Sequence, residues 1–299
     1  MAHRNAASFV SHEIETHSIQ GQAVEETFTI RVLQPMRRAD GSERFPVLYA
    51  TDSDYFFGGL ADLATLMQGY GEVPRFILVG IGYRNAPAAA VLRMRDLFSR
   101  PVQKILETYI SQVAESDFVS GLGEVRVVTE TTDAVDFLRF IRAELMPFVA
   151  SRYPTIPDDN SYWGYSAGGT FGLHTLFTEP DTFKRYILGS PGVSYKGHHF
   201  GIELAESFLN VGRPMNAQVF LSVGELEEFH AASANFDLVT GYIRLVQFLQ
   251  QAAIPGLSLT TRVFPGESHA TAWTAAFTHG LKPVFGSAAG VPFWPDSLK

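Results

Sequence analysis

Two kinds of segment alternate along the chain: some have the pattern of apolar residues expected of strands, and others have the pattern expected of helices. Residues 8–19 and 26–34 alternate polar and apolar positions with a period of two, as expected of strands that have one exposed face. Several later runs are almost continuously apolar, which is typical of strands covered on both faces. The pattern predicts eight strands in all, the last six at 45–51, 75–82, 161–166, 185–190, 218–224 and 257–265.

Helical patterns lie between the predicted strands. The longest covers residues 132–153, where Phe137, Phe140, Ile141 and Leu145 follow the three-to-four-residue spacing of a helix face. Similar patterns occupy 59–70, 168–177, 233–252 and 269–285. Because strands and helices alternate, we expect an α/β fold with a mostly parallel sheet and helices on both faces. No linker divides the chain, so residues 1–299 are predicted to form a single domain.

Two segments interrupt this alternation. Residues 101–129 hold a helical piece followed by a loop, and residues 190–208 follow the sixth predicted strand. Long excursions of this kind often cover binding sites, and ligands of open α/β sheets bind at the carboxyl ends of the strands. We therefore expect 101–129 to be a lid or pocket insertion.

A Gly-x-Ser-x-Gly motif stands where the fifth predicted strand meets a helix. Gly164 and Gly168 flank Ser166 at two-residue spacing. Small residues allow a tight strand-to-helix turn that exposes the serine above the sheet, at the positive end of the helix dipole. The motif alone is also compatible with a serine that only caps the helix. Its context favours a catalytic nucleophile.

That context is the order of candidate partners along the chain. A serine after the fifth strand calls for an acidic residue after the seventh strand and a histidine after the eighth. Glu227 and Glu225 follow the seventh strand, and His269 follows the eighth. His269 would act as the base for Ser166, with Glu227 as the favoured acid, Glu225 as the alternative, and a dyad without a carboxylate left open.

An oxyanion hole for such a nucleophile needs two N–H donors. We expect one from Ala167, which follows the serine, and the other from Ser53 or Asp54 in the loop after the third strand. Both residues would also suit a turn that caps the next helix.

Composition and charge narrow the functional classes. The net charge of −8 disfavours a nucleic-acid partner, and the absence of cysteine excludes thiolate chemistry. No window reaches the length of a membrane span, and the N-terminus lacks the apolar core of a signal peptide, so we expect a cytoplasmic protein without a membrane partner. His198 and His199 are adjacent but have no third ligand at suitable spacing, so neither a metal nor a cofactor is expected.

Blocks of sequence resemble the esterase D branch of the α/β-hydrolases, and its siderophore esterases most. They are "FPVLYATDSDYFF", "LRMRDLFSRP", "AVDFLRFIRAELMPFVASRYP", "WGYSAGGTFGLHTLF", "VGELEE" and "FPGESHATA", within residues 45–285. This resemblance implies the α/β-hydrolase fold with an eight-stranded sheet and a metal-independent serine esterase. It implies a small-molecule ester substrate of moderate size, such as an aromatic ester or a siderophore macrolactone.

The substrate contacts are less defined by sequence. Arg84, Tyr165, Tyr195 and Trp273 are candidate binding residues, and Arg93 with Asp96 is expected to form a structural ion pair near the site. Aromatic residues are common in this chain, so each single one fits a core position better than a ligand contact. An acyltransferase with the same triad and a non-catalytic binding protein on a hydrolase scaffold remain alternatives, and both a monomer and a homodimer fit the sequence.

Overall fold

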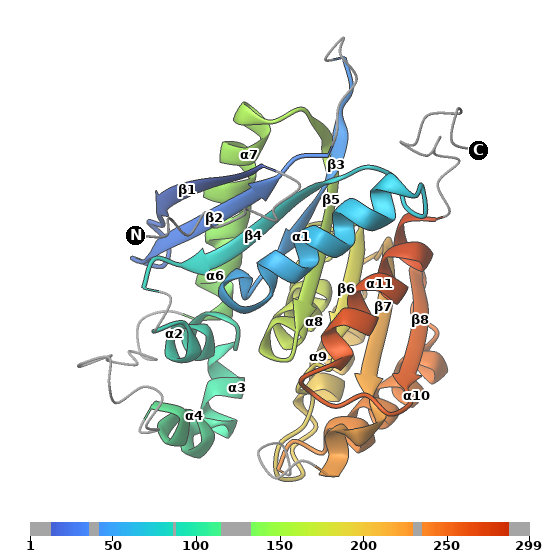
Figure 1. The fold of residues 1–299 in the computed structure, drawn as a ribbon. Coiled ribbons are helices and arrows are strands. Elements are labelled where there is room, and N and C mark those ends of the chain that lie inside the picture. Colours follow the sequence, from blue (N-terminus) through green and yellow to red (C-terminus); the bar gives the residue numbers. More distant parts are fainter. Residues whose placement is uncertain (1–12, 36–41, 86–87, 115–132, 230–234, 287–299) are drawn as a thin grey trace, which may run out of the picture.

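A computed structural model describes residues 13–35, 42–85, 88–114, 133–229 and 235–286 (Figure 1). Its centre is an eight-stranded sheet with the order β1-β2-β4-β3-β5-β6-β7-β8. The first three strands in this order pair antiparallel, and all later pairs are parallel. The strands are β1 (Ile14–Gln20), β2 (Thr27–Leu33), β3 (Phe45–Ala50), β4 (Ile77–Tyr83), β5 (Thr155–Tyr165), β6 (Arg185–Gly189), β7 (Ala217–Gly224) and β8 (Leu257–Phe264). All eight predicted strands and the mostly parallel sheet are confirmed.

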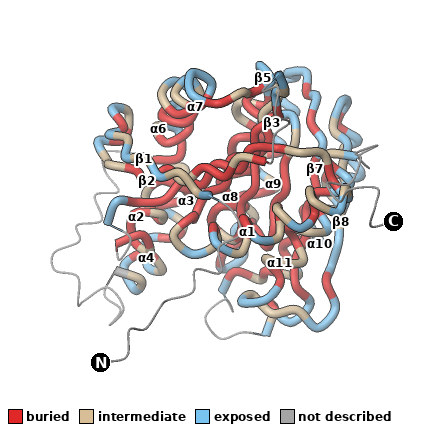
Figure 2. The backbone as a smooth tube through the Cα atoms, turned by 45° about the horizontal axis from the view of Figure 1, so that its top comes forward, coloured by how far each residue is buried: buried red, intermediate tan, exposed pale blue. Residues whose placement is uncertain are grey.

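Helices cover both faces of the sheet, as predicted. Helices α1 (Ser53–Gly69) and α11 (Ala272–Phe285) lie on one face (Figure 1). The other face carries α6 (Ala134–Phe140), α7 (Met146–Arg152), α8 (Ala167–Thr178) and α10 (Leu238–Ala252). The resulting three-layer arrangement leaves the central strands buried between two helix layers (Figure 2).

The side chains of one central strand explain why both faces are apolar. Along β5, Tyr162 belongs to the core on the α8 face, whereas Trp163 and Tyr165 belong to the core on the α11 face. Successive side chains of a strand point to opposite faces, so a strand buried on both sides needs apolar residues at every position. This is the reason for the continuous apolar runs in the sequence.

The long helical pattern at 132–153 forms one helical run with a local irregularity. A π-helical turn, η2 (Ile141–Leu145), joins α6 to α7. Pro147 follows within two residues. Proline has no N–H to donate and its ring clashes with the carbonyl four residues earlier, so a widened turn just before it is a common accommodation. The helix was predicted correctly, and the proline accounts for its interruption.

The chain between β4 and the long helical run, and the segment after β6, contain further helices. Three short ones precede the long helical run: α2 (Ala89–Asp96), α3 (Arg100–Ile105) and α4 (Glu107–Ala114). Helix α9 (Phe200–Val211) was not predicted as a helix and lies after β6. The second half of the expected lid, residues 115–132, lies outside the described residues. No helix in the described part of the chain is both long and apolar enough to cross a membrane.

Candidate active site

A strained turn joins β5 to α8 at Ser166. The serine has φ 58° and ψ −120°, and its N–H donates to the carbonyl of Gly189 (2.9 Å). A positive φ is unfavourable for any residue with a Cβ atom, and such strain is common where a side chain must be presented for function. The strand, the sharp turn and the helix follow in the order that the motif predicted.

The two flanking glycines make this turn sterically feasible. A Cβ atom on Gly164 would lie 2.2 Å from the carbonyl oxygen of Gly168, and one on Gly168 would lie 2.5 Å from Thr51 Oγ1. Strand and helix therefore approach each other more closely than any larger residue would permit.

Gly164→Ala is expected to destabilise the protein by about 3 kcal/mol, because the added methyl group must displace backbone atoms of α8. The measurement is the free energy of unfolding in urea. Gly58→Ala is a matched control, since Gly58 is exposed within α1 and an added Cβ meets nothing within 4 Å. That change should stabilise the helix by about 0.5–1 kcal/mol. Equal effects of the two substitutions would contradict the close approach.

His269 and Glu227 come together from two loops at the same sheet edge. Glu227 lies in η3 (Glu225–Phe229), directly after β7, and His269 follows β8. Their side chains are joined by a hydrogen bond of 2.8 Å between Nδ1 and Oε2. Because an ionised carboxylate can only accept, Nδ1 carries the proton in this pair. Nε2 is then left as an acceptor.

The Glu227 carboxylate is held from several directions. Its side chain is fully buried, and Oε1 accepts hydrogen bonds from Ser190 Oγ (2.5 Å) and the Gly224 N–H (2.8 Å). Tyr165 donates its hydroxyl to the His269 carbonyl (2.8 Å), which holds the histidine loop against the end of β5. These contacts fix the carboxylate and the imidazole before any substrate arrives.

The neighbouring glutamates have other partners. Glu225 is exposed and accepts a hydrogen bond from the Gly266 N–H (2.9 Å). Glu228 accepts from the N–H groups of Val239 (2.8 Å) and Thr240 (3.1 Å), at the first turn of α10. Among the described residues, Glu227 is the one of the three that is hydrogen-bonded to His269.

Glu228→Ala should lower stability at neutral pH without loss of turnover, because it removes a helix-cap acceptor worth about 1 kcal/mol. Burial would raise the pKa of Glu228, but the hydrogen bonds from Thr240 and Val239 outweigh it and lower the pKa. A carboxylate with a lowered folded pKa stabilises the fold above its unfolded pKa and loses this contribution as the pH falls through the folded value. The difference in unfolding free energy between wild type and variant should therefore shrink below about pH 4. A difference that persists in acid would contradict the capping role.

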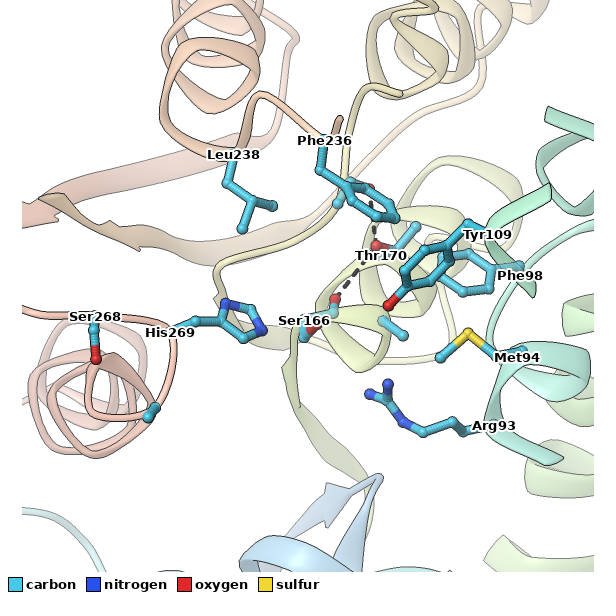
Figure 3. A pocket seen from close by; sticks show the side chains of 13 residues that line it. Arg93, Met94, Phe98, Tyr109, Ser166, Thr170, Phe236, Leu238, Ser268 and His269 are labelled. Atoms are coloured by element: carbon cyan, nitrogen blue, oxygen red, sulfur yellow. Dashed lines mark hydrogen bonds between the residues drawn. The ribbon is translucent and has the colours of Figure 1, made fainter. Parts of the chain in front are cut away.

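Ser166 and His269 line one cavity of about 350 Å³, with the imidazole beside the serine (Figure 3). No hydrogen bond joins the two side chains in the described part of the chain. Such contacts in ligand-free enzymes often tighten only when a substrate is bound. Most of the remaining wall is apolar and comes from α2 and the residues just after it, from α4 and α8, and from the residues at the beginning of α10 and just before it: Met94, Phe98, Tyr109, Ala167, Thr170, Phe236 and Leu238.

Arg93 is the one cation among the described residues that line this cavity. Its Nε and Nη2 donate to the two carboxylate oxygens of Asp52 (2.7 and 2.8 Å). Burial would lower the pKa of Arg93, but the Asp52 carboxylate raises it above its ordinary value, so the guanidinium stays charged. The expected Arg93–Asp96 pair is wrong, because Asp96 is bound by Arg95 and by the Tyr83 hydroxyl. Arg93 instead connects α2 to the loop after β3.

The expected oxyanion donors fall in two different places. Ala167 begins α8 and lines the cavity beside Ser166. Ser53 and Asp54 are not part of that wall, and their side chains accept from Arg31 Nη1 (2.7 and 3.1 Å). Asp54 also accepts from the Tyr83 N–H (2.7 Å). These side chains anchor the β3–α1 turn, and a backbone donor from this turn stays a prediction.

The four candidate binding residues do not line the described cavity. Arg84 is exposed just after the end of β4. Trp273 belongs to α11 and packs against α1, on the face of the sheet opposite to α8. Tyr165 is buried beneath His269, with ring centroids 5.0 Å apart. Tyr195 packs behind two wall residues, Tyr109 and Phe236. Sequence reasoning did not identify Tyr109 and Phe236 as cavity residues, because they come from segments far from the Gly-x-Ser-x-Gly motif.

The fold and the strained serine turn together define the α/β-hydrolase class. A family model described as "Putative esterase" matches residues 105–283. The chain therefore belongs to this esterase family, which confirms the family resemblance and the assignment as an esterase.

Curated and solved relatives agree with this family. The ferri-bacillibactin esterase BesA of Bacillus subtilis is 29% identical over 245 residues, which cover 80% of this chain and 78% of BesA. The crystal structure of the BES protein from Bacillus cereus has a TM-score of 0.71 at 22% identity, covering 92% of this chain and 95% of that one. The siderophore hydrolase EstB from Aspergillus nidulans has a TM-score of 0.72 at 20% identity, covering 93% and 97%. At such identities the two structures support the fold alone.

Proposed function

We propose that the protein hydrolyses carboxylic esters through an acyl-enzyme on Ser166, with His269 as general base and Glu227 as the acid. The observation that carries this proposal is the arrangement around His269. Nδ1 of the ring is hydrogen-bonded to the fully buried Glu227 carboxylate, and the ring lies beside Ser166, which stands on a strained turn (Figure 3). A free serine hydroxyl is a weak nucleophile, and this arrangement supplies the base that it needs.

The reaction would proceed in two halves. In the first, Ser166 Oγ bonds to the acyl carbon while His269 Nε2 takes its proton, and the ester oxygen then leaves as an alcohol with that proton. In the second, water bonds to the acyl carbon, gives a proton to His269 and releases the acid, and the proton returns to Ser166. Glu227 would stabilise the imidazolium in both halves, and the Ala167 N–H would bind the developing oxyanion.

The cavity wall suggests the kind of ester. It is mostly apolar, it includes the fixed cation of Arg93, and it contains no carboxylate among the described lining residues. Apolar walls with a few polar groups suit a ligand with an aromatic or aliphatic body. Arg93 would suit a phenolate or carboxylate on that body. Together with the sequence similarity to BesA, this favours an aromatic ester or a siderophore macrolactone as the substrate.

The test is a panel of 4-nitrophenyl butyrate, methyl ferulate and a catecholate trilactone, assayed with and without an added alcohol acceptor. Release of free acid that does not change with the acceptor supports hydrolysis. Transfer of the acyl group to the acceptor would support an acyltransferase instead. No turnover of any ester, with no labelling of Ser166 by a fluorophosphonate probe, would contradict the proposal.

A further inference from the structure

A second cavity lies next to the active-site cavity, on the far side of Thr170. It has a volume of about 210 Å³ and is bounded by α3 and the end of α2 on one side, α9 on the other, and α8 between them. Its apolar wall includes Leu97, Val102, Ile105, Leu173 and Leu204. Thr170 and Gly192 line both cavities, so the two cavities adjoin at these residues.

Helix α8 connects the two cavities along one face. Ser166, Thr170 and His174 are spaced four residues apart, which places them above one another on the helix. Eight residues of helix correspond to a rise of roughly 12 Å, so His174 lies about that far from the serine along the axis. Ser166 lines the first cavity and His174 lines the second.

His174 is a polar residue in the wall of this apolar cavity. Its residue is 7% exposed, and its Nε2 atom is buried without a hydrogen-bond partner among the described residues. Burial lowers its pKa, only partly opposed by Asp133, so the imidazole is neutral at pH 7. Leaving such an atom without a partner is unfavourable, and a ligand group that hydrogen-bonds to it would remove that cost.

The position of His269 indicates which part of an ester would enter. His269 must return its proton to the leaving alcohol, so the alcohol departs on the side of the imidazole. Thr170 and Phe98 lie on the other side of Ser166 (Figure 3). The acyl part therefore points away from His269, toward Thr170, where the two cavities adjoin.

We propose that the second cavity binds the far end of the acyl chain of the substrate, with a hydroxyl, carbonyl or amide of that chain hydrogen-bonded to His174. This inference rests on the ester hydrolysis proposed above. It adds a site for a long, neutral acyl group to the catalytic cavity.

Size and charge support this occupant. A cavity of 210 Å³ is smaller than the roughly 300–1,000 Å³ typical of separate ligand sites, whereas the two cavities together fall within that range. Glu203, which is exposed, is the one charged side chain among the described residues that line the second cavity. Because no cation stands among its described lining residues, a neutral acyl end fits this cavity and a carboxylate does not.

The first test fills the cavity. In Leu204→Trp, kcat/KM for 4-nitrophenyl decanoate should fall at least about tenfold while that for 4-nitrophenyl acetate stays within about twofold of wild type. Leu209→Trp places the same residue on α9 outside the cavity and is the matched control. Ile105→Trp fills the cavity from the opposite wall and should reproduce the selective loss. Equal losses for both esters, or no loss for the decanoate in both filling variants, would overturn the proposal.

The second test concerns His174. Wild type should prefer 4-nitrophenyl ω-hydroxydecanoate over the decanoate, and His174→Phe should reduce that preference by about tenfold. The phenyl ring keeps the bulk and removes both nitrogens, so a merely structural role would change the two esters alike. An unchanged preference would overturn the role of His174.

A binding measurement separates failure of this inference from failure of the proposed reaction. The unreactive ω-hydroxydecanamide is titrated calorimetrically into wild type, Ser166→Ala and Leu204→Trp. Binding to the first two and not to the third supports the acyl site even if no ester is turned over, in which case the proposed reaction is wrong. If the wild type turns over esters and all three proteins bind the amide equally well, the proposed reaction is supported and the acyl site is rejected.

Discussion

Ser166→Ala is expected to reduce kcat for 4-nitrophenyl butyrate by about 10⁶-fold, leaving a residual rate about 10³–10⁴-fold above the uncatalysed reaction. The methyl group keeps the Cβ atom, and the N–H bond to Gly189 does not involve the side chain. The fold and the melting temperature should therefore stay close to those of wild type. Turnover is measured by release of 4-nitrophenolate, and covalent labelling by a fluorophosphonate should disappear in parallel.

One outcome would contradict the assignment of Ser166. Full activity in Ser166→Ala would show that another group attacks the ester. Loss of activity together with loss of the folded state would leave the chemistry undecided for that variant, so Ser190→Ala serves as a comparison. Ser190 is also buried at a sheet edge and at a positive φ, but it contacts Glu227 and not the cavity. It should retain labelling.

Glu227→Gln is expected to lower kcat by about 10⁴-fold, with a smaller change in KM. An amide can offer its N–H₂ to Nδ1 of His269, which would shift the imidazole proton to Nε2 and leave no acceptor for the Ser166 hydroxyl. The neutral amide would also fail to stabilise the imidazolium. The measurement is kcat across the pH range in which the wild-type enzyme is active.

Glu225→Gln is the matched control for this change. It makes the same replacement two residues away, at an exposed side chain bonded to the Gly266 N–H. Its kcat should stay within about twofold of wild type, as for most surface substitutions. If Glu225→Gln is the damaging change, or if Glu227→Gln keeps its rate, the acid is assigned wrongly or the enzyme works as a dyad.

The strands and the serine turn could be predicted from sequence because local patterns determine them. Continuous apolar runs identify the buried strands, and the spacing of Gly164, Ser166 and Gly168 identifies the turn. The order of candidate residues then placed Glu227 and His269 in adjacent loops. Neighbouring parallel strands end at the same edge of the sheet. The strand that each residue follows was therefore enough to predict that Glu227 and His269 lie close together.

The choice between the glutamates depended on detail that sequence does not carry. The segment folds as a 3-10 helix with three residues per turn, so Glu225 and Glu228 share a side and Glu227 lies on another. Nothing in "ELEEF" distinguishes this turn from an α-helical or extended one. Sequence favoured Glu227, and the hydrogen bonds of the three residues now give a physical reason for that preference.

The cavity wall was the least predictable part. Arg93 finds its partner at Asp52, 41 positions earlier, rather than at the nearby Asp96. Tyr109 and Phe236 meet over the serine from segments separated by more than a hundred residues. Such contacts depend on how α2, α4 and the start of α10 pack against one another, and the sequence pattern of each element alone does not determine that.

At Ser166 the residue that would best suit the backbone conformation differs from the residue that catalysis needs. Its φ and ψ match the first central position of a type II′ turn, where glycine is strongly preferred. Glycine here would relax the turn and remove the hydroxyl at once. Selection of this protein for heat resistance alone would therefore reward the loss of its nucleophile, and any search for hardier variants must score turnover alongside survival.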